Sequence, residues 1–174
     1  MKGKNCQIPK QSKNLASIDL NWLTNCEIKG IILDLDNTLI SEDDYYLSPD
    51  GETWIEQAKS AGVKFFILSN GKRRYRLEYW SRRLDIPGIS RARKPFPFGF
   101  RKALVQMKLK SQQVVVIGDS RHTDILGAWI SGHRSIQVAS LPHPPRWWER
   151  CFGRWVQFPY PHIEELLQFD PSEY

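Results

Sequence analysis

Short, mostly apolar segments alternate along this chain with longer segments in which apolar residues recur every three or four positions. The short segments lie at residues 28–35, 63–68, 114–117 and 135–138, and their apolar stretches include 31–33, 65–68 and 114–117. Apolar stretches bounded in this way are typical of strands that are covered on both faces in a parallel sheet. The periodic segments predict helices at residues 49–61, 73–84, 98–107 and 125–130. Strands that alternate with helices predict an α/β fold, a Rossmann-like three-layer sandwich with a mostly parallel central sheet.

Composition divides the chain into three segments. Residues 1–18 are mostly polar and are predicted to be a flexible N-terminal segment, whereas residues 19–141 are predicted to form the core domain. Residues 142–174 form an aromatic tail that includes Trp147, Trp148 and Trp155. Tryptophan interleaved with arginine is typical both of a helix packed on a core and of a segment at a membrane interface, and both interpretations stay open.

The net charge of +6 is unevenly distributed along the chain. Residues 71–110 contain 13 Lys or Arg residues but only two acids, Glu78 and Asp85. A local positive field of this kind attracts anions such as phosphate esters, although a merely solvated basic helix face at 73–84 is an equally good interpretation.

The cysteines and the apolar runs bear on the cellular compartment. The chain has three cysteines, Cys6, Cys26 and Cys151, which are odd in number and widely spaced. This pattern argues against a disulfide framework or a zinc cluster and favours a reducing cytosol. We find no secretory signal and no run of the ~20 apolar residues that span a bilayer. We therefore expect a cytoplasmic location, with peripheral contact to the inner membrane face as an option left open by the basic and aromatic segments.

Polar residues of a catalytic kind follow three of the four predicted strands. They are Asp34 and Asp36, Ser69 and Asn70, and Asp119. Ligands of open α/β sheets bind at the carboxyl ends of the strands. Two carboxylates exposed there repel each other unless a cation or a shared proton relieves the charge, so the pattern predicts a divalent metal together with a phosphate.

Four motifs in order resemble those of the haloacid dehalogenase (HAD) superfamily. They are Asp34-Leu35-Asp36-Asn37-Thr38-Leu39, Ser69-Asn70, Lys94-Pro95 and Gly118-Asp119-Ser120-Arg121-His122-Thr123-Asp124. Each motif alone is common, but their order and their places at predicted strand ends make the resemblance specific between about residues 28 and 138.

The resemblance implies a role for each matching residue. Asp34 would be the nucleophile and Asp36 the general acid/base, with Ser69 and Lys94 completing the catalytic set. Asp34 and Asp119 would bind Mg²⁺ with their side chains and Asp36 with its backbone carbonyl. Asp124 would support the metal, either directly or through water. Substrate contacts are expected from the neighbours of these motifs, Thr38, Asn70, Lys72 and Arg73.

The spacing of the motifs leaves no room for a cap domain. Residues 39–68 and residues 70–93 separate the first three motifs, and the predicted helices and strands already occupy them. The chain thus resembles the capless subclass III of the superfamily, and within it the branch of phosphatidylglycerophosphate phosphatases and their bacterial relatives. Gly71 and Ser120 depart from the residues expected in that branch.

This resemblance implies a Mg²⁺-dependent phosphate monoester hydrolase that converts phosphatidylglycerophosphate to phosphatidylglycerol through an aspartyl-phosphate. Two alternatives stay open: a phosphatase for a soluble metabolite or phosphoprotein, and, more remotely, a non-catalytic nucleic-acid-binding module that uses the basic residues 71–110. The complete set of catalytic residues argues against the second, and no nucleic-acid partner is expected.

Overall fold

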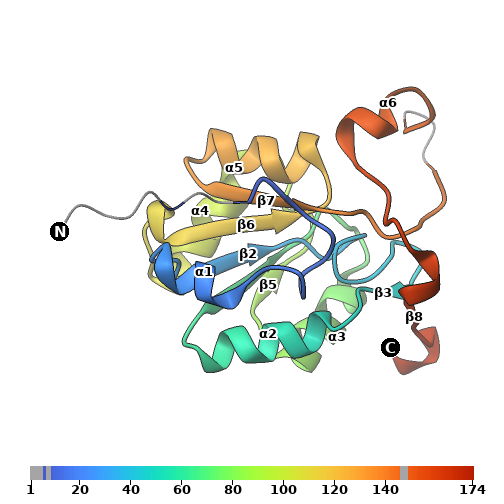
Figure 1. The fold of residues 1–174 in the computed structure, drawn as a ribbon, viewed down its shortest axis with the longest axis horizontal. Coiled ribbons are helices and arrows are strands. Elements are labelled where there is room, and N and C mark those ends of the chain that lie inside the picture. Colours follow the sequence, from blue (N-terminus) through green and yellow to red (C-terminus); the bar gives the residue numbers. More distant parts are fainter. Residues whose placement is uncertain (1–5, 7–8, 146–148) are drawn as a thin grey trace.

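The central feature of the computed structural model is a six-stranded parallel sheet (Figure 1). The structure describes residues 6, 9–145 and 149–174. The sheet has the order β1-β7-β6-β2-β4-β5. Its strands are β1 (Gln11–Ser12), β2 (Gly30–Leu33), β4 (Lys64–Leu68), β5 (Gly88–Ile89), β6 (Val114–Gly118) and β7 (Arg134–Val138). All of its pairings are parallel, so the predicted α/β architecture is confirmed.

Helices cover both faces of this sheet and give three layers (Figure 1). One apolar core joins the sheet to α1 (Leu20–Asn25), α2 (Gly51–Ser60) and α3 (Arg74–Leu84). The other joins it to α4 (Pro97–Met107) and α5 (Leu126–Ile130). Successive residues of β2 point to opposite faces, so Ile31 and Ile32 enter different cores, as expected for a strand buried on both sides.

The strand register brings the predicted site residues to one edge. Ile32 of β2 lies between Phe66 of β4 and Val116 of β6. The segments that follow these three strands therefore leave the sheet side by side. No cap domain interrupts the described residues between β2 and α4, in agreement with the short gaps in the sequence.

The N-terminal segment is more ordered than its composition predicts. β1 pairs with β7 at the edge of the sheet, and Leu15 and Ile18 are buried in the core. Residues 9–18 therefore belong to the core domain, because their few apolar side chains have a place to pack. Residues 1–5 and 7–8 lie outside the described part of the chain.

The interpretation of the cysteines is wrong for one pair. Cys6 and Cys26 form a disulfide across the end of α1, with their Cα atoms 5.5 Å apart. Their separation of 20 residues along the chain gave no sign of this proximity. Cys151 is free and exposed.

The helix predicted at 49–61 begins at Gly51 rather than at Pro49, after Asp50 in a left-handed conformation. The short strands β3 (Tyr46–Leu47), β5 and β8 (Leu167–Gln168) were not predicted, because two residues are too few to show a hydrophobic pattern.

The aromatic tail folds back over the core. After α6 (Glu149–Val156), β8 pairs with β3 in a small antiparallel sheet, and Phe169 packs against Trp80 of α3 with ring centroids 5.4 Å apart. Trp155 of α6 is exposed, whereas Trp147 and Trp148 lie outside the described residues. None of the helices in the described segments is both long and apolar enough to cross a membrane.

Candidate active site

A cleft of about 540 Å³ lies at the carboxyl ends of β2, β4 and β6. Its walls come from the loop after β2, the loop after β4, the segment before α4 and the turn η2 (Arg121–Ile125). Its lining residues are Asp34, Asp36, Asn37, Glu42, Asn70, Gly71, Lys72, Arg73, Lys94, Asp119, Ser120, His122, Thr123 and Gln157. The four motifs, far apart in sequence, therefore meet at this one position.

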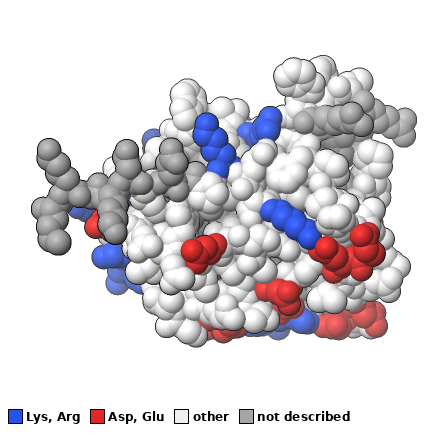
Figure 2. Space-filling model, viewed as in Figure 1, with Lys and Arg blue, Asp and Glu red and all other residues white. Residues whose placement is uncertain are grey.

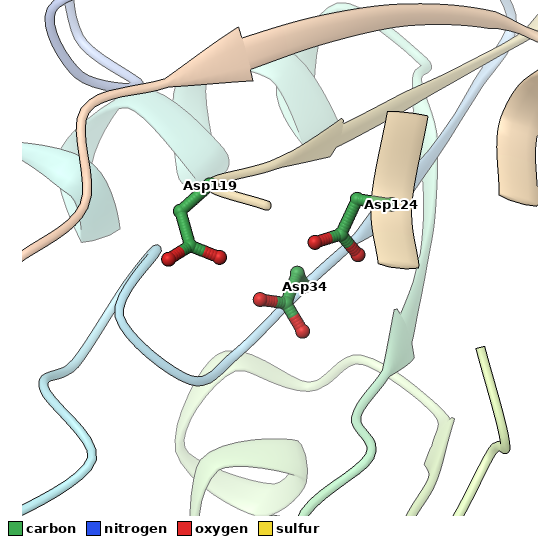
Figure 3. Close-up of side chains that lie close together, drawn as sticks. All are labelled: Asp34, Asp119 and Asp124. Atoms are coloured by element: carbon green, nitrogen blue, oxygen red, sulfur yellow. The ribbon is translucent and has the colours of Figure 1, made fainter. Parts of the chain in front are cut away.

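Three buried carboxylates converge at the base of the cleft (Figure 3). Asp34 follows β2, Asp119 follows β6, and Asp124 lies in η2. Each offers an oxygen, and these oxygens all lie within 4.8 Å of one another. Gly118 makes this approach possible, because a Cβ there would lie 2.4 Å from Cγ of Asp124.

Lys94 bridges two of these carboxylates. Its ammonium donates to Oδ1 of Asp34 at 2.5 Å and to Oδ1 of Asp124 at 2.6 Å. Burial lowers the pKa of Lys94, but Asp124 and Asp34 outweigh it and raise that pKa above its ordinary value. Asn70 fixes the backbone of Lys94, since its side chain both donates to the carbonyl at 3.0 Å and accepts from the N–H at 2.7 Å.

One lysine does not balance three buried carboxylates. Burial, followed by the charge of Asp124, raises the pKa of Asp34 well above its ordinary value. The same two causes raise the pKa of Asp119 to about 7. Converging carboxylate oxygens with an excess of negative charge are what a hard divalent cation requires, so the residues present fit such an ion.

The tail contributes a residue to this site that sequence reasoning missed. Gln157 donates to Oδ2 of Asp119 at 2.6 Å, and Ser140 donates to the same oxygen at 2.7 Å. Gln137 of β7 holds the tail in place by donating to the carbonyl of Val156 at 3.1 Å. Only the aromatic residues of the tail entered the predictions from sequence, which therefore did not include this polar contact.

The carboxylate of Asp36 is not part of the cluster formed by the other three. Its Oδ2 accepts from the hydroxyl of Ser69 at 2.5 Å, and its Oδ1 accepts from the guanidinium of Arg76. Gly71 leaves room for this arrangement, because a Cβ there would lie 3.1 Å from the Asp36 carboxylate. Ser69 and Arg76 thus hold the side chain of Asp36 beside the cluster.

Arg76 is a second residue that sequence reasoning missed. It is only 2% exposed and pairs with both Asp36 and Asp44. Burial lowers its pKa, but the two carboxylates outweigh this and raise it above the ordinary value. The hydroxyl of Tyr174 also donates to Asp44, at 2.6 Å, so the tail reaches this network too.

The predicted substrate-binding residues take different positions relative to the cleft. Lys72 is exposed at the mouth of the cleft, whereas Arg73 also lines it but donates to Asp44 at 2.5 Å. Thr38 lies behind Asp34 and donates to its Oδ2 at 3.2 Å. Thr38 and Ser69 do not line the cleft formed by the described residues.

The basic face of α3 is largely neutralised. Arg74 pairs with Glu78, and Arg83 pairs with Glu52 and Glu173. Arg73 and Arg76 are also paired with acids, so Arg82 is the one arginine of residues 73–84 that forms no ion pair with a described residue.

Comparisons with known proteins agree with this fold and site. Residues 91–149 match the family model described as HAD-hydrolase-like. The chain is 41% identical over 129 residues, 74% of either chain, to the probable phosphatase YqeG of Bacillus subtilis (strain 168).

Three solved structures share the fold at 16–20% identity. An uncharacterized protein of Listeria monocytogenes has a TM-score of 0.55, with 63% of this chain and 78% of that chain covered. One from Corynebacterium glutamicum has a TM-score of 0.53, with 74% and 92% covered. The cobalt-bound deoxy-D-mannose-octulosonate 8-phosphate phosphatase of Haemophilus influenzae has a TM-score of 0.52, with 71% and 74% covered.

The identity to YqeG extends over most of both chains, and the described residues have the HAD-like α/β fold without a cap. The chain belongs to the HAD-like hydrolases, in the family of the probable phosphatase YqeG, and it is a HAD-type phosphatase.

Proposed function

We propose that this phosphatase hydrolyses a phosphate monoester through an aspartyl-phosphate formed on Asp34, with Mg²⁺ as its cofactor. The observation that carries the proposal is the position of Asp34. It lies at the base of an open cleft, and Lys94 and two further carboxylates surround it. A carboxylate in this position can attack the phosphorus of a bound ester.

In the first step, an oxygen of Asp34 forms a bond to phosphorus while the bond from phosphorus to the leaving oxygen breaks. Asp36 gives its proton to that leaving oxygen, so the alcohol departs neutral. The side chain of Asp36 must turn from Ser69 and Arg76 toward the cleft to do so.

In the second step, Asp36 takes a proton from water, and the water oxygen attacks phosphorus. The bond between phosphorus and Asp34 breaks, which releases inorganic phosphate and restores the carboxylate. The nearby hydroxyl of Ser69 and the ammonium of Lys94 are proposed to hold the phosphoryl oxygens, whose charge has to be balanced in the transition state.

The neighbouring residues are proposed to position this machinery. Thr38 orients Asp34 through its hydrogen bond, and Asn70 orients Lys94. Lys72 and Arg73 at the mouth are proposed to contact the substrate, Arg73 after leaving Asp44.

Mg²⁺ is the proposed ion because three carboxylates and no nitrogen or sulfur ligand converge among the described residues. Asp34 and Asp119, the backbone carbonyl of Asp36 and, directly or through water, Asp124 would hold it. When bound, the ion supplies positive charge that offsets the repulsion between phosphate and carboxylates.

The proposed substrate is phosphatidylglycerophosphate at the cytosolic membrane face. An uncapped cleft suits a phosphate carried by a large or surface-bound molecule, because nothing has to close over the leaving group. Exposed Lys72 at the mouth offers a positive charge to a second phosphate of the headgroup.

A phosphate-release screen tests both levels of the proposal. We expect release from phosphatidylglycerophosphate in mixed micelles with Mg²⁺ and none with EDTA. Turnover of sugar or nucleotide phosphates or of a phosphopeptide, without turnover of the lipid, would refute the lipid substrate and leave the chemistry intact.

Asp34→Asn should abolish turnover on every substrate, whereas Asp36→Asn should slow it and let phosphoenzyme accumulate. Asp85→Asn is a matched control, because Asp85 is exposed and asparagine tolerates its left-handed conformation. Wild-type rates in Asp34→Asn would eliminate the proposed nucleophile.

A further inference from the structure

Exposed apolar side chains gather on the side of the sheet that α4 and α5 cover. Phe98 is 71% exposed and Trp129 is 76% exposed. Four more apolar residues on these helices or next to them are exposed, namely Phe96, Val105, Leu126 and Ile130. We call these six residues, with the basic residues described next, the α4–α5 face.

The basic residues of this face form no ion pair with an acid in the described part of the chain. Residues 86–118 contain no Asp or Glu, and neither do residues 125–148. Arg91, Arg93, Arg101 and Lys102 are exposed and form no ion pair with any described residue. This distinguishes them from the arginines of α3 that are paired with acids. Over α5, the upper part of Figure 2 shows Lys and Arg but no Asp or Glu.

This face borders the active-site cleft. Lys94 lies in the site, and Phe96 follows it by two residues at the start of α4. η2, whose His122 and Thr123 line the cleft, leads directly into α5. The two helices pack closely where they begin, since a Cβ on Gly127 would lie 3.2 Å from Cα of Pro95 and 2.5 Å from Cζ of Phe100.

Exposed apolar side chains, together with exposed basic ones that form no ion pair with a described residue, match the chemistry of an anionic bilayer surface. Tryptophan and phenylalanine settle at the level of the headgroups, and lysine and arginine are attracted to anionic lipid. Aromatic and basic residues also bind single-stranded nucleic acid, but Val105, Leu126 and Ile130 are aliphatic and cannot stack on bases. The composition of the face thus favours a membrane.

We propose that the α4–α5 face docks on an anionic membrane surface and brings the cleft to the lipid headgroups. The proposal deepens the proposed function, on whose lipid substrate it rests, by naming the surface that meets the membrane. It moves membrane contact away from α3, whose arginines other than Arg82 are paired with acids.

Sedimentation with vesicles tests the docking without any turnover. We expect binding to phosphatidylcholine vesicles that contain phosphatidylglycerol, little binding to pure phosphatidylcholine, and weaker binding as salt increases. Phe98→Ala/Trp129→Ala should reduce the partition coefficient about tenfold because apolar insertion is lost. Arg101→Glu/Lys102→Glu should reduce it by at least about tenfold.

The matched charge control is Lys29→Glu/Arg82→Glu, which makes the same change in net charge at exposed positions outside the face. It should retain most of the binding. All variants should hydrolyse a soluble aryl phosphate at the wild-type rate, which shows that they are folded and active.

Three results of the vesicle experiments would overturn the docking proposal. One is the absence of binding to anionic vesicles, and another is an equal loss of binding in the control variant. The third is a loss in Trp155→Ala of α6 without a loss in Phe98→Ala/Trp129→Ala. Binding to a single-stranded oligonucleotide that exceeds vesicle binding and needs the same residues would assign the face to nucleic acid instead. Aryl phosphate turnover that survives any of these results would show that only the docking proposal had failed.

Discussion

Single residues divide the charges of the active site into two groups. Asp34 and Asp124 bind the ammonium of Lys94, and together with Asp119 they carry an excess of negative charge. Asp36 belongs to the other group, in which it shares the buried Arg76 with Asp44. The first group suits the binding of a cation and a phosphoryl group. The second group fixes the position of the Asp36 side chain before proton transfer.

Gln157 links the first group to the tail. Gln157→Leu should raise the pKa of Asp119 above about 7, because the hydrogen bond that favours its ionised form is lost. Losing this bond should cost about 1–3 kcal/mol, equivalent to a roughly 5- to 150-fold rise in the Mg²⁺ concentration that half-saturates activity.

A Mg²⁺ titration of turnover measures this effect. Gln168→Leu is the control, since Gln168 is exposed in β8. An unchanged Mg²⁺ requirement in Gln157→Leu would show that the tail does not tune this carboxylate.

Arg76 holds the second group together. Arg76→Met should destabilise the fold by about 3–5 kcal/mol, because it leaves the carboxylates of Asp36 and Asp44 without their buried counter-charge. Urea unfolding measures the loss. Arg74→Met should change the free energy of unfolding by less than about 0.5 kcal/mol, because the Arg74–Glu78 pair lies on the exposed surface of α3. Equal effects of the two substitutions would refute the structural role of Arg76.

At the scale of elements, the site depends on how β6 passes into η2. β6 ends at Gly118, and the chain returns within six residues so that Asp124 lies against that glycine. Strand, glycine and turn thus place Asp119 and Asp124 together, and α5 continues from the turn into the exposed α4–α5 face.

Gly118→Ala should displace Asp124 from Lys94 and lower turnover by at least about 100-fold, as misplacement of catalytic groups by about 1 Å does. Steady-state turnover and the unfolding midpoint separate a damaged site from a damaged fold. Gly132→Ala is the contrasting control: its φ of 71° makes alanine strained, yet no atom lies within 4 Å of the added Cβ. Gly132→Ala should lower the unfolding midpoint and keep wild-type turnover. Loss of turnover in Gly132→Ala, or wild-type turnover in Gly118→Ala, would contradict the role of Gly118 in placing Asp124.

At the scale of the whole molecule, the unbalanced carboxylates couple stability to pH. Burial and Asp124 raise the pKa of Asp119 in the folded state to about 7, whereas the ordinary value of 3.8 applies to the unfolded chain. Between these values the folded state binds more protons than the unfolded state, so this group makes stability fall as pH rises. Asp34, with its raised pKa, acts in the same direction.

In EDTA, the unfolding temperature should therefore be lower at pH 8 than at pH 6, and Mg²⁺ should raise it more at pH 8, where the ion competes with fewer protons. Thermal scans of the wild type and of Asp119→Asn check this. Asp119→Asn should reduce the difference in unfolding temperature between pH 6 and pH 8. An equal rise in unfolding temperature with Mg²⁺ at both pH values in the wild type would contradict the carboxylate cluster as the cation site.

The amino-acid sequence by itself determined the parallel α/β fold and the meeting of the four motifs. Both follow from short-range patterns: apolar runs define the buried strands, and residues that directly follow parallel strands leave the sheet at one edge. Asp34 and Asp119 could thus be named in advance as neighbours, and the resemblance to the HAD motifs added Lys94. The short gaps between motifs excluded a cap.

Only the tertiary structure decided which partners these residues have. Gln157 meets Asp119 across 38 residues of sequence and Arg76 meets Asp36 across 40. It also decided that every arginine of α3 except Arg82 is paired with an acid, whereas the exposed arginines near α4 form no ion pair with a described residue. Such contacts depend on where the tail folds back and on how side chains pack, and no local spacing encodes either.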